Sequence, residues 1–158
     1  MDFNKIKCIY FLGIGGIGMS ALARYFKTLN KLVCGYDKTP TGLTDALIQE
    51  GIQVHFEDDI SFFKSQINAP KEEVLIVLTP AVPKDHAEYN YFLKEGYRIL
   101  KRSEVLGLIT QNTYTLAVAG THGKTTTSSI LAHILKSANK DCSAFLGVIT
   151  RNFNSNFL

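Results

Sequence analysis

The stretch Gly120-Thr121-His122-Gly123-Lys124-Thr125 constrains this chain more than any other part of the sequence. An apolar segment, 114–119, precedes it, and a segment with helical spacing of apolar residues, 125–136, follows it. In a strand–loop–helix unit of this kind, glycines let backbone amides turn toward a phosphate group, while the helix N-terminus and the lysine supply positive charge. The sequence therefore predicts a phosphate-binding loop.

Thr125 occupies the position whose hydroxyl ligates a magnesium ion between two phosphates in P-loop proteins. The loop departs from the general P-loop pattern at one position, because Val118 stands where the first glycine is expected. The shorter pattern Gly-Thr-x-Gly-Lys-Thr fits in full. The alternative is an ordinary glycine-rich turn between a strand and a helix.

A second glycine-rich loop lies near the start of the chain. An apolar segment, 7–12, leads into Gly13-Ile14-Gly15-Gly16-Ile17-Gly18, and a helical pattern follows over 17–29. This glycine spacing is typical of loops that bind a pyrophosphate. A further apolar strand, 32–36, ends at Asp37, which is placed to accept hydrogen bonds from a ribose. The alternative is a strand–helix–strand unit that binds no ligand.

The remaining pattern alternates strands and helices. The further expected strands are 53–55, 74–78, 98–100 and 141–146, and the further expected helices are 43–49, 86–95 and 104–110. Nearly continuous apolar strands are typical of a parallel sheet covered on both faces. The sequence predicts an α/β fold: a Rossmann-like doubly wound parallel sheet in a first domain, 1–108, and the truncated start of a P-loop ATPase-type α/β domain, 109–158.

Composition excludes several classes of protein. The net charge of +3 comes without a basic cluster, so nucleic acid is not an expected partner. No apolar run has the length of about 18 residues that a membrane-spanning helix requires, so membrane insertion is not expected. The three cysteines, Cys8, Cys34 and Cys142, fall in expected strands without metal-ligand spacing. We expect them to be free thiols of a cytoplasmic protein.

Both loops resemble those of the Mur ligase family, as does the segment 79–108 between them, which contains Ala81-Val82-Pro83 and Arg102-Ser103-Glu104. The resemblance covers essentially the whole chain and corresponds to the N-terminal domain and the start of the central one of three domains. His122 is typical of the branch that adds L-alanine and of the related murein-peptide ligases. Tyr36 and Val148 are departures, because the family often has serine and glycine there.

The resemblance implies an ATP-dependent ligase of peptidoglycan synthesis. Such an enzyme joins L-alanine to UDP-N-acetylmuramate through an acyl phosphate, with ATP and Mg²⁺ as cofactors. Lys124 would act on the ATP phosphates, and His122 would either contact the γ-phosphate or acyl phosphate or shape the loop. The implied ATP-binding residues are Gly120, Thr121, His122, Gly123, Lys124, Thr125 and Thr126, with Thr125 as the metal ligand.

The first loop would then bind the UDP substrate. The implied contacts are Gly13, Gly15, Gly16, Ile17, Gly18 and Asp37. His55 is a further candidate for the uridine, against a surface or packing role, and Thr79 and Ala81 are candidates for the diphosphate-sugar, against a simple connecting turn. Arg102 is a candidate phosphate partner, against a structural role. His86 and His133 are expected to be surface or packing residues.

Other functions remain open from the sequence. A murein-peptide ligase would share both loops, an NAD-binding dehydrogenase domain would explain only the first, and a non-catalytic UDP-sugar-binding module would need no chemistry. A chain of 158 residues holds too few strands to complete the second domain. We therefore expect it to be a poor or inactive ligase alone, with an apolar face on helix 125–136 that favours either self-association or local mobility.

Overall fold

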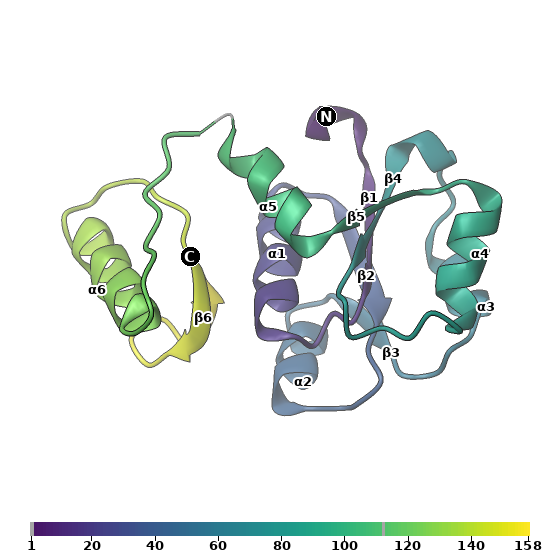
Figure 1. The fold of residues 1–158 in the computed structure, drawn as a ribbon, viewed down its shortest axis with the longest axis horizontal. Helices are drawn as coiled ribbons and strands as arrows, with labels where there is room; N and C mark the ends of the chain where they lie inside the picture. The colour runs from purple at the N-terminus through teal and green to yellow at the C-terminus, as the bar shows by residue number, and fades with distance from the viewer. Residues whose placement is uncertain (1, 112) are drawn as a thin grey trace.

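A five-stranded parallel sheet forms the first part of the protein, in a computed structural model that describes residues 2–111 and 113–158 (Figure 1). Its strand order is β3-β2-β1-β4-β5, with every pair parallel. The strands are β1 (Cys8–Leu12), β2 (Leu32–Tyr36), β3 (Gln53–His55), β4 (Val74–Leu78) and β5 (Arg98–Lys101). The expected Rossmann-like parallel sheet is confirmed.

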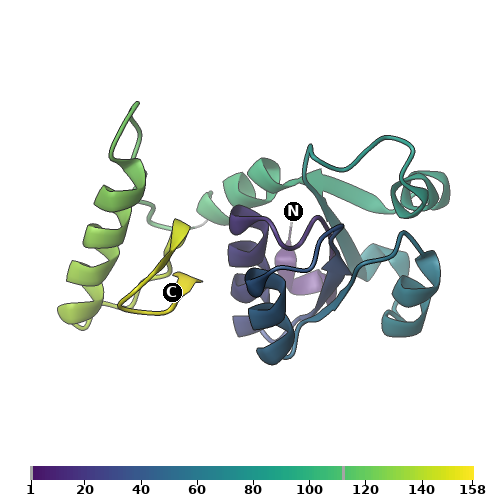
Figure 2. The same cartoon turned by 90° about the horizontal axis from the view of Figure 1, so that it is seen from below.

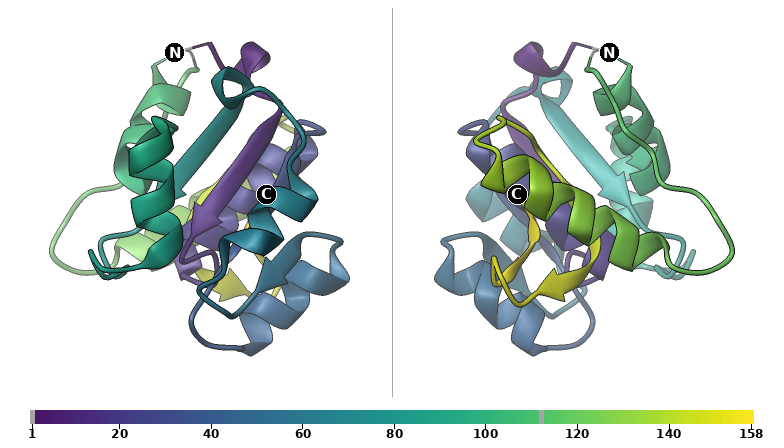
Figure 3. Two further views of the ribbon diagram at one scale, coloured as in Figure 1. Left: turned by 90° about the vertical axis from the view of Figure 1, so that its right-hand side faces the viewer. Right: turned by 90° about the vertical axis from the view of Figure 1, so that its left-hand side faces the viewer.

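Helices cover both faces of this sheet, as Figures 1 and 3 show. One face carries α1 (Ile17–Thr28), α2 (Gly42–Gln49) and α5 (Arg102–Thr110), and the other carries α3 (Ile60–Gln66) and α4 (Ala87–Glu95). Short 3₁₀ turns, Phe3–Lys5 and Lys71–Glu73, complete this part. The sequence did not predict α3, a short helix that begins after Asp59, whose side chain accepts a hydrogen bond from Ser61 N. Among the described residues, no helix has the length and hydropathy to cross a bilayer.

The central strand β1 is buried along its whole length. Because side chains alternate between the two faces of a strand, Ile9 and Phe11 join the core under α1, while Tyr10 and Leu12 join the core under α3 and α4. The same second core contains Cys34, and burial raises the pKa of its thiol to about 12. This thiol is therefore protonated and unreactive, in keeping with a structural role.

A buried polar network lies beneath α4. Tyr10 and Glu88 have no exposed surface, and Tyr10 Oη donates to Glu88 Oε1 at 2.8 Å. His55 Nε2 lies 2.6 Å from Tyr10 Oη and 3.1 Å from Glu88 Oε1. Burial, followed by the charge of Glu88, raises the pKa of Tyr10 far above its usual range, so the hydroxyl keeps its proton and donates. These contacts offset the cost of burying the carboxylate.

The second part of the chain is smaller and packs on α1. It contains α6 (Lys124–Ser137) and an antiparallel hairpin of β6 (Phe145–Thr150) and β7 (Ser155–Phe157). Figures 1 and 2 show β6 between α6 and α1. Tyr25 of α1 meets the rings of Phe145 and Phe157 at centroid distances of 5.4 and 5.8 Å. The hairpin is thus held to the first sheet by aromatic packing.

A buried polar contact reinforces this attachment. Asn156 has no exposed surface, and its Nδ2 donates to Ser20 Oγ at 2.9 Å and to Ile17 O. Arg24, also buried, donates to Asn156 Oδ1 and, through Nε, to Glu50 Oε2 at 2.9 Å. One side chain of the hairpin therefore links the second part to the first turn of α1.

Two expectations for the second part were wrong. Residues 114–119 form no strand and are largely exposed, with Tyr114 94% exposed, because a strand needs a hydrogen-bonded neighbour that the described residues do not provide. The strand expected over 141–146 begins only at Phe145 and continues to Thr150. The division between residues 108 and 109 stays a prediction.

Hydrogen–deuterium exchange tests how far the second part folds on its own. We expect the amides of β1 and β4 to exchange slowest and those of 114–119 and α6 to exchange much faster. The reason is that Ile130 and Ile134 on α6 are 54% and 57% exposed, so little buried apolar surface holds this helix. Uniformly slow exchange in a dilute monomer would contradict this expectation, whereas slowing with concentration would indicate self-association.

A Tyr10→Phe variant tests the buried network. Removal of the hydroxyl takes away the hydrogen bond that Tyr10 donates to the buried Glu88, so the free energy of unfolding should fall by about 1–3 kcal/mol. Chemical denaturation measures the change. Tyr91→Phe is the matched control, because the Tyr91 hydroxyl makes no hydrogen bond to the described residues. Equal stability of the two variants would show that the network contributes nothing.

Candidate functional site

The first glycine loop begins at the carboxyl end of β1, where open α/β sheets bind their ligands. Gly13 has a φ of +88°, a left-handed conformation that favours glycine. A Cβ at this position would lie 2.4 Å from Thr79 Cγ2, so the loop after β4 approaches the glycine closely. The sequence needs glycine here both for the turn and for this contact.

The start of α1 provides free hydrogen-bond donors. The amides of Ile17 and Gly18, the first two residues of the helix, make no backbone hydrogen bond to the described part of the chain. Such amides, together with the helix dipole, favour an anion. The guanidinium of Arg102 lies beside them, since a Cβ on Gly18 would come 2.9 Å from Arg102 Nη1. This end of the site is therefore positive.

Asp37 joins the loop to the end of β2. Its Oδ2 accepts a hydrogen bond from Gly15 N at 2.7 Å, and its Oδ1 accepts one from Thr39 N at 3.1 Å. A Cβ on Gly15 would lie 2.8 Å from the same Oδ2, so only glycine lets the carboxylate come this close. Asp37 thus shapes the loop in addition to the ribose contact that the sequence predicts for it.

These elements enclose a cleft of about 590 Å³, here called the glycine cleft. Six of the predicted UDP-binding residues line it, and Ile17 and Gly18 lie next to it in the chain without lining it. The lining residues are Gly13, Gly15, Gly16, Tyr36, Asp37, Lys38, Asp58, Thr79, Ala81, Val82, Pro83, Asp85 and His86. Its lining brings Asp37, Asp58 and Asp85 together with Lys38, so negative charge dominates beyond the glycines.

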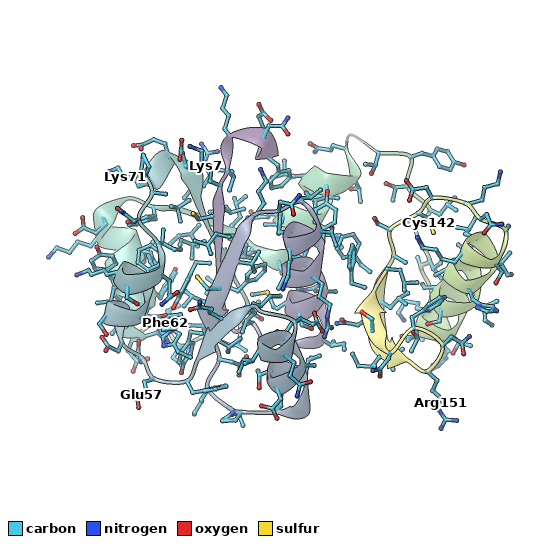
Figure 4. All side chains as sticks on the ribbon, turned by 180° about the vertical axis from the view of Figure 1, so that it is seen from behind. Lys7, Glu57, Phe62, Lys71, Cys142 and Arg151 are labelled. Carbon is cyan, nitrogen blue, oxygen red and sulfur yellow. The ribbon has the colours of Figure 1, made fainter. Side chains whose placement is uncertain are left out.

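His55 is the one predicted substrate residue that lies elsewhere. It belongs to the network with Tyr10 and Glu88, and its ring stacks on Phe62 at a centroid distance of 4.1 Å. It lines a separate, shallower depression with Phe56 and Glu57, and Glu57 points away from the protein (Figure 4). Its contacts favour the packing role over the uridine contact.

The second glycine loop leads directly into α6. Gly120 and Gly123 have φ values of +149° and +76°, and Gly123 immediately precedes the helix. Lys124 Nζ donates to the carbonyls of Gly120 and, at 3.1 Å, of Thr121. The loop is exposed over its whole length, 120–127, and no side-chain hydrogen bond or ion pair links His122 to the other described residues. A phosphate bound here would compete with the loop carbonyls for the lysine.

The donor set around Thr125 fits only part of a magnesium site. Its Oγ1 faces the start of β6, because a Cβ on Gly147 would lie 3.3 Å from it. The described residues contain no cluster of three or more histidine, cysteine or acidic side chains that could hold a metal. Magnesium commonly takes one or two protein ligands and completes its shell with phosphates and water. Thr125 can therefore supply one oxygen ligand to such a site.

Asp58 and His86 are among the lining residues that the sequence did not predict as site residues. Asp58 follows β3 and accepts hydrogen bonds from Ala87 N and Glu88 N, so it caps α4 from 29 residues away. His86, expected to be an ordinary surface or packing residue, is buried in the wall of the cleft. No local pattern marks either residue, because their neighbours come from distant segments.

Comparison with known proteins agrees with this architecture. The model of the Mur ligase family, catalytic domain, matches residues 8–114. The UDP-N-acetylmuramate–L-alanine ligase of Flavobacterium psychrophilum is 58% identical over all 158 residues, which cover 35% of that relative. The ligase of the same name from Porphyromonas gingivalis is 58% identical over 153 residues, which are 97% of this chain and 33% of the relative.

Solved structures show the same fold. The UDP-N-acetylmuramate–alanine ligase of Thermotoga maritima superposes with a TM-score of 0.81 at 33% identity, over 94% of this chain and 34% of that one. The UDP-N-acetylmuramate:L-alanyl-gamma-D-glutamyl-meso-diaminopimelate ligase of Neisseria meningitides gives a TM-score of 0.84 at 27% identity, over 96% and 46%. The chain spans about a third of the length of the curated relatives that it matches, 35% of the first. Since the family model matches more than half of the chain, this protein belongs to the Mur ligase family.

Proposed function

We propose that this chain supplies the UDP-substrate cleft and the ATP loop of an ATP-dependent ligase that joins L-alanine to UDP-N-acetylmuramate. The observation that carries the proposal is the pairing of a glycine cleft beside free helix amides with a second lysine-bearing glycine loop. Identities of 58% to proteins named for this reaction support it. The reaction belongs to peptidoglycan synthesis, and we propose that the chain acts in the cytoplasm, a reducing compartment in which free thiols such as those of Cys8, Cys34 and Cys142 persist.

In the glycine cleft, the charge distribution fits a nucleotide sugar in one orientation. The amides of Ile17 and Gly18 and the guanidinium of Arg102 would receive the diphosphate. Asp37 would accept a hydrogen bond from the ribose while it retains the loop through Gly15. Thr79 and Ala81, on the opposite wall, would contact the sugar side of the diphosphate.

At the second loop, this chain's residues would position ATP. Lys124 would leave the carbonyls of Gly120 and Thr121 and neutralise the β- and γ-phosphates, while the loop amides hold them in line. Thr125 would give one oxygen to a magnesium ion, which supplies charge neutralisation between the phosphates. His122, on the exposed loop, would contact the γ-phosphate.

The chemistry that these parts serve is activation of a carboxylate. The lactyl carboxylate of UDP-N-acetylmuramate attacks the γ-phosphate and forms an acyl phosphate with loss of ADP. The amine of L-alanine then attacks the acyl carbon, and phosphate leaves as the amide forms. We propose that the residues that bind alanine and complete the metal site lie in the parts of the relatives that this chain does not cover.

A murein-peptide ligase is the second candidate within the family, and a dehydrogenase is not favoured. Solved murein-peptide ligases share the fold at 27% and 31% identity, close to the 33% of the solved alanine ligase, so the solved structures do not separate the two candidates. The curated relatives named for alanine addition reach 58%. A dehydrogenase would leave the second loop without a function.

Titration calorimetry tests ligand choice in the glycine cleft. UDP-N-acetylmuramate should bind the chain and NAD should not. Asp37→Ala should weaken UDP binding by about 1–3 kcal/mol, the scale of a lost hydrogen bond to a charged group. Asp45→Ala, on the exposed side of α2, should bind UDP as the unchanged chain does. Tight NAD binding without a response to UDP would contradict the proposal.

A chimera tests the ATP loop. This chain would replace the corresponding N-terminal part of the Flavobacterium psychrophilum ligase, to which all 158 residues align. We expect the chimera to release phosphate only with ATP, L-alanine and UDP-N-acetylmuramate together. Lys124→Ala should abolish that activity and leave UDP binding unchanged, whereas Lys140→Ala, in the exposed turn after α6, should be active. Retention of most activity in Lys124→Ala would refute the role of Lys124.

A further inference from the structure

His86 is the one described residue whose buried side-chain polar atoms have no hydrogen-bond partner. Its side chain is only 4% exposed, and both Nδ1 and Nε2 are covered. Folded proteins rarely leave such atoms unpaired, because each costs free energy that a partner would recover. The ring lies beside Tyr36, Asp58 and the glycine cleft, and the missing hydrogen-bond partner must be sought among these.

The nearest carboxylate does not satisfy the ring. Nδ1 lies 3.1 Å from Asp58 Oδ1, within ion-pair distance but without hydrogen-bond geometry. Both oxygens of Asp58 already accept backbone hydrogen bonds, Oδ2 from Ala87 N at 2.8 Å and Oδ1 from Glu88 N at 3.1 Å. Both carboxylate oxygens of Asp58 are thus hydrogen-bonded to the first turn of α4. Asp58 restricts the position of the His86 ring without pairing its nitrogens.

His86 lies among the carboxylates that line the glycine cleft, at the end opposite in charge to the amides at the start of α1. Its ring meets Tyr36 edge-on at a centroid distance of 4.5 Å, and both residues line the cleft with Asp37 and Asp58. Carboxylates repel phosphates, so the diphosphate of a nucleotide belongs with the amides of α1 and the neutral nucleoside belongs at this acidic end. The ring is therefore next to the place where base and ribose would lie.

We propose that His86 is a recognition residue for the nucleoside end of the bound nucleotide, and this rests on the proposed function of the cleft. The ring turns toward the cleft on binding, and its nitrogens exchange hydrogen bonds with the polar edge of the base or with the ribose hydroxyls. Tyr36 presents its aromatic edge beside the same group. In the free protein the two nitrogens lack hydrogen bonds, which costs free energy, and ligand binding removes this cost by giving them partners.

The test compares His86→Phe with the unchanged chain. Phenylalanine keeps a planar ring against Tyr36 and removes both nitrogens. Calorimetric titrations with UDP and with inorganic pyrophosphate separate the nucleoside end from the phosphate end, and thermal denaturation reports stability. His86→Gln retains a donor and an acceptor and serves as the conservative variant. His133→Phe, on the exposed side of α6, is the matched control.

We expect His86→Phe to bind UDP about tenfold more weakly, the scale of one net hydrogen bond, with unchanged pyrophosphate affinity. Its thermal midpoint should stay equal or rise, because the unpaired nitrogens are gone, and His86→Gln should recover part of the UDP affinity. The inference is overturned if His86→Phe binds UDP normally. It is also overturned if His86→Phe lowers the affinities for UDP and for pyrophosphate together and lowers the thermal midpoint. If His86→Phe does not fold, an equal loss of both affinities in His86→Gln overturns the inference. Absence of UDP binding by the unchanged chain would instead refute the proposed function.

Discussion

The burial of β1 between two parallel neighbours is the constraint on which the rest of this structure depends. Every residue of the strand is buried and pairs with both β2 and β4. The end of β1 is thereby fixed, and the chain must turn at Gly13 into α1 at that point. The glycine cleft, the helix amides and the hairpin anchored by Asn156 on α1 all take their positions from this strand.

The two glycine loops differ in how much support the chain gives them. The first is enclosed: Asp37 holds Gly15, Thr79 lies against Gly13, and α1 is packed into the core. The second is exposed, its preceding segment has no strand partner among the described residues, and Lys124 contacts only carbonyls of its own loop. We therefore expect binding at the first site to need only local rearrangement, such as the turn of the His86 ring, and we propose that the second site needs additional sheet that the described residues do not provide.

Most of the sheet could be predicted because the pattern that marks each strand lies within the strand's own residues and those next to it. Continuous apolar runs and glycine spacing placed β1, β2, β3 and β4 and the start of α1 within a residue or so. The segment 114–119 has the same apolar character, yet strand formation depends on a partner elsewhere. Local pattern alone was therefore insufficient there.

The composition of the cleft was predictable only in part, for the same reason. The glycines and Asp37 follow strands directly, so their place at the sheet edge follows from the topology. Asp58 and His86 enter the cleft through contacts between segments about 30 residues apart in sequence, and Asn156 is buried by a helix at the opposite end of the chain. His55 has the right position along β3, but its ring turns into the network with Tyr10 and Glu88.

The most direct test of this account is an amide chemical-shift map of the chain titrated with UDP-N-acetylmuramate and, separately, with ATP and magnesium. We expect the UDP substrate to shift the amides of 13–18, Asp37 and 79–86 and to leave those of 120–127 unchanged. Shifts confined to 120–127, or none at the glycine cleft at saturating UDP substrate, would contradict it.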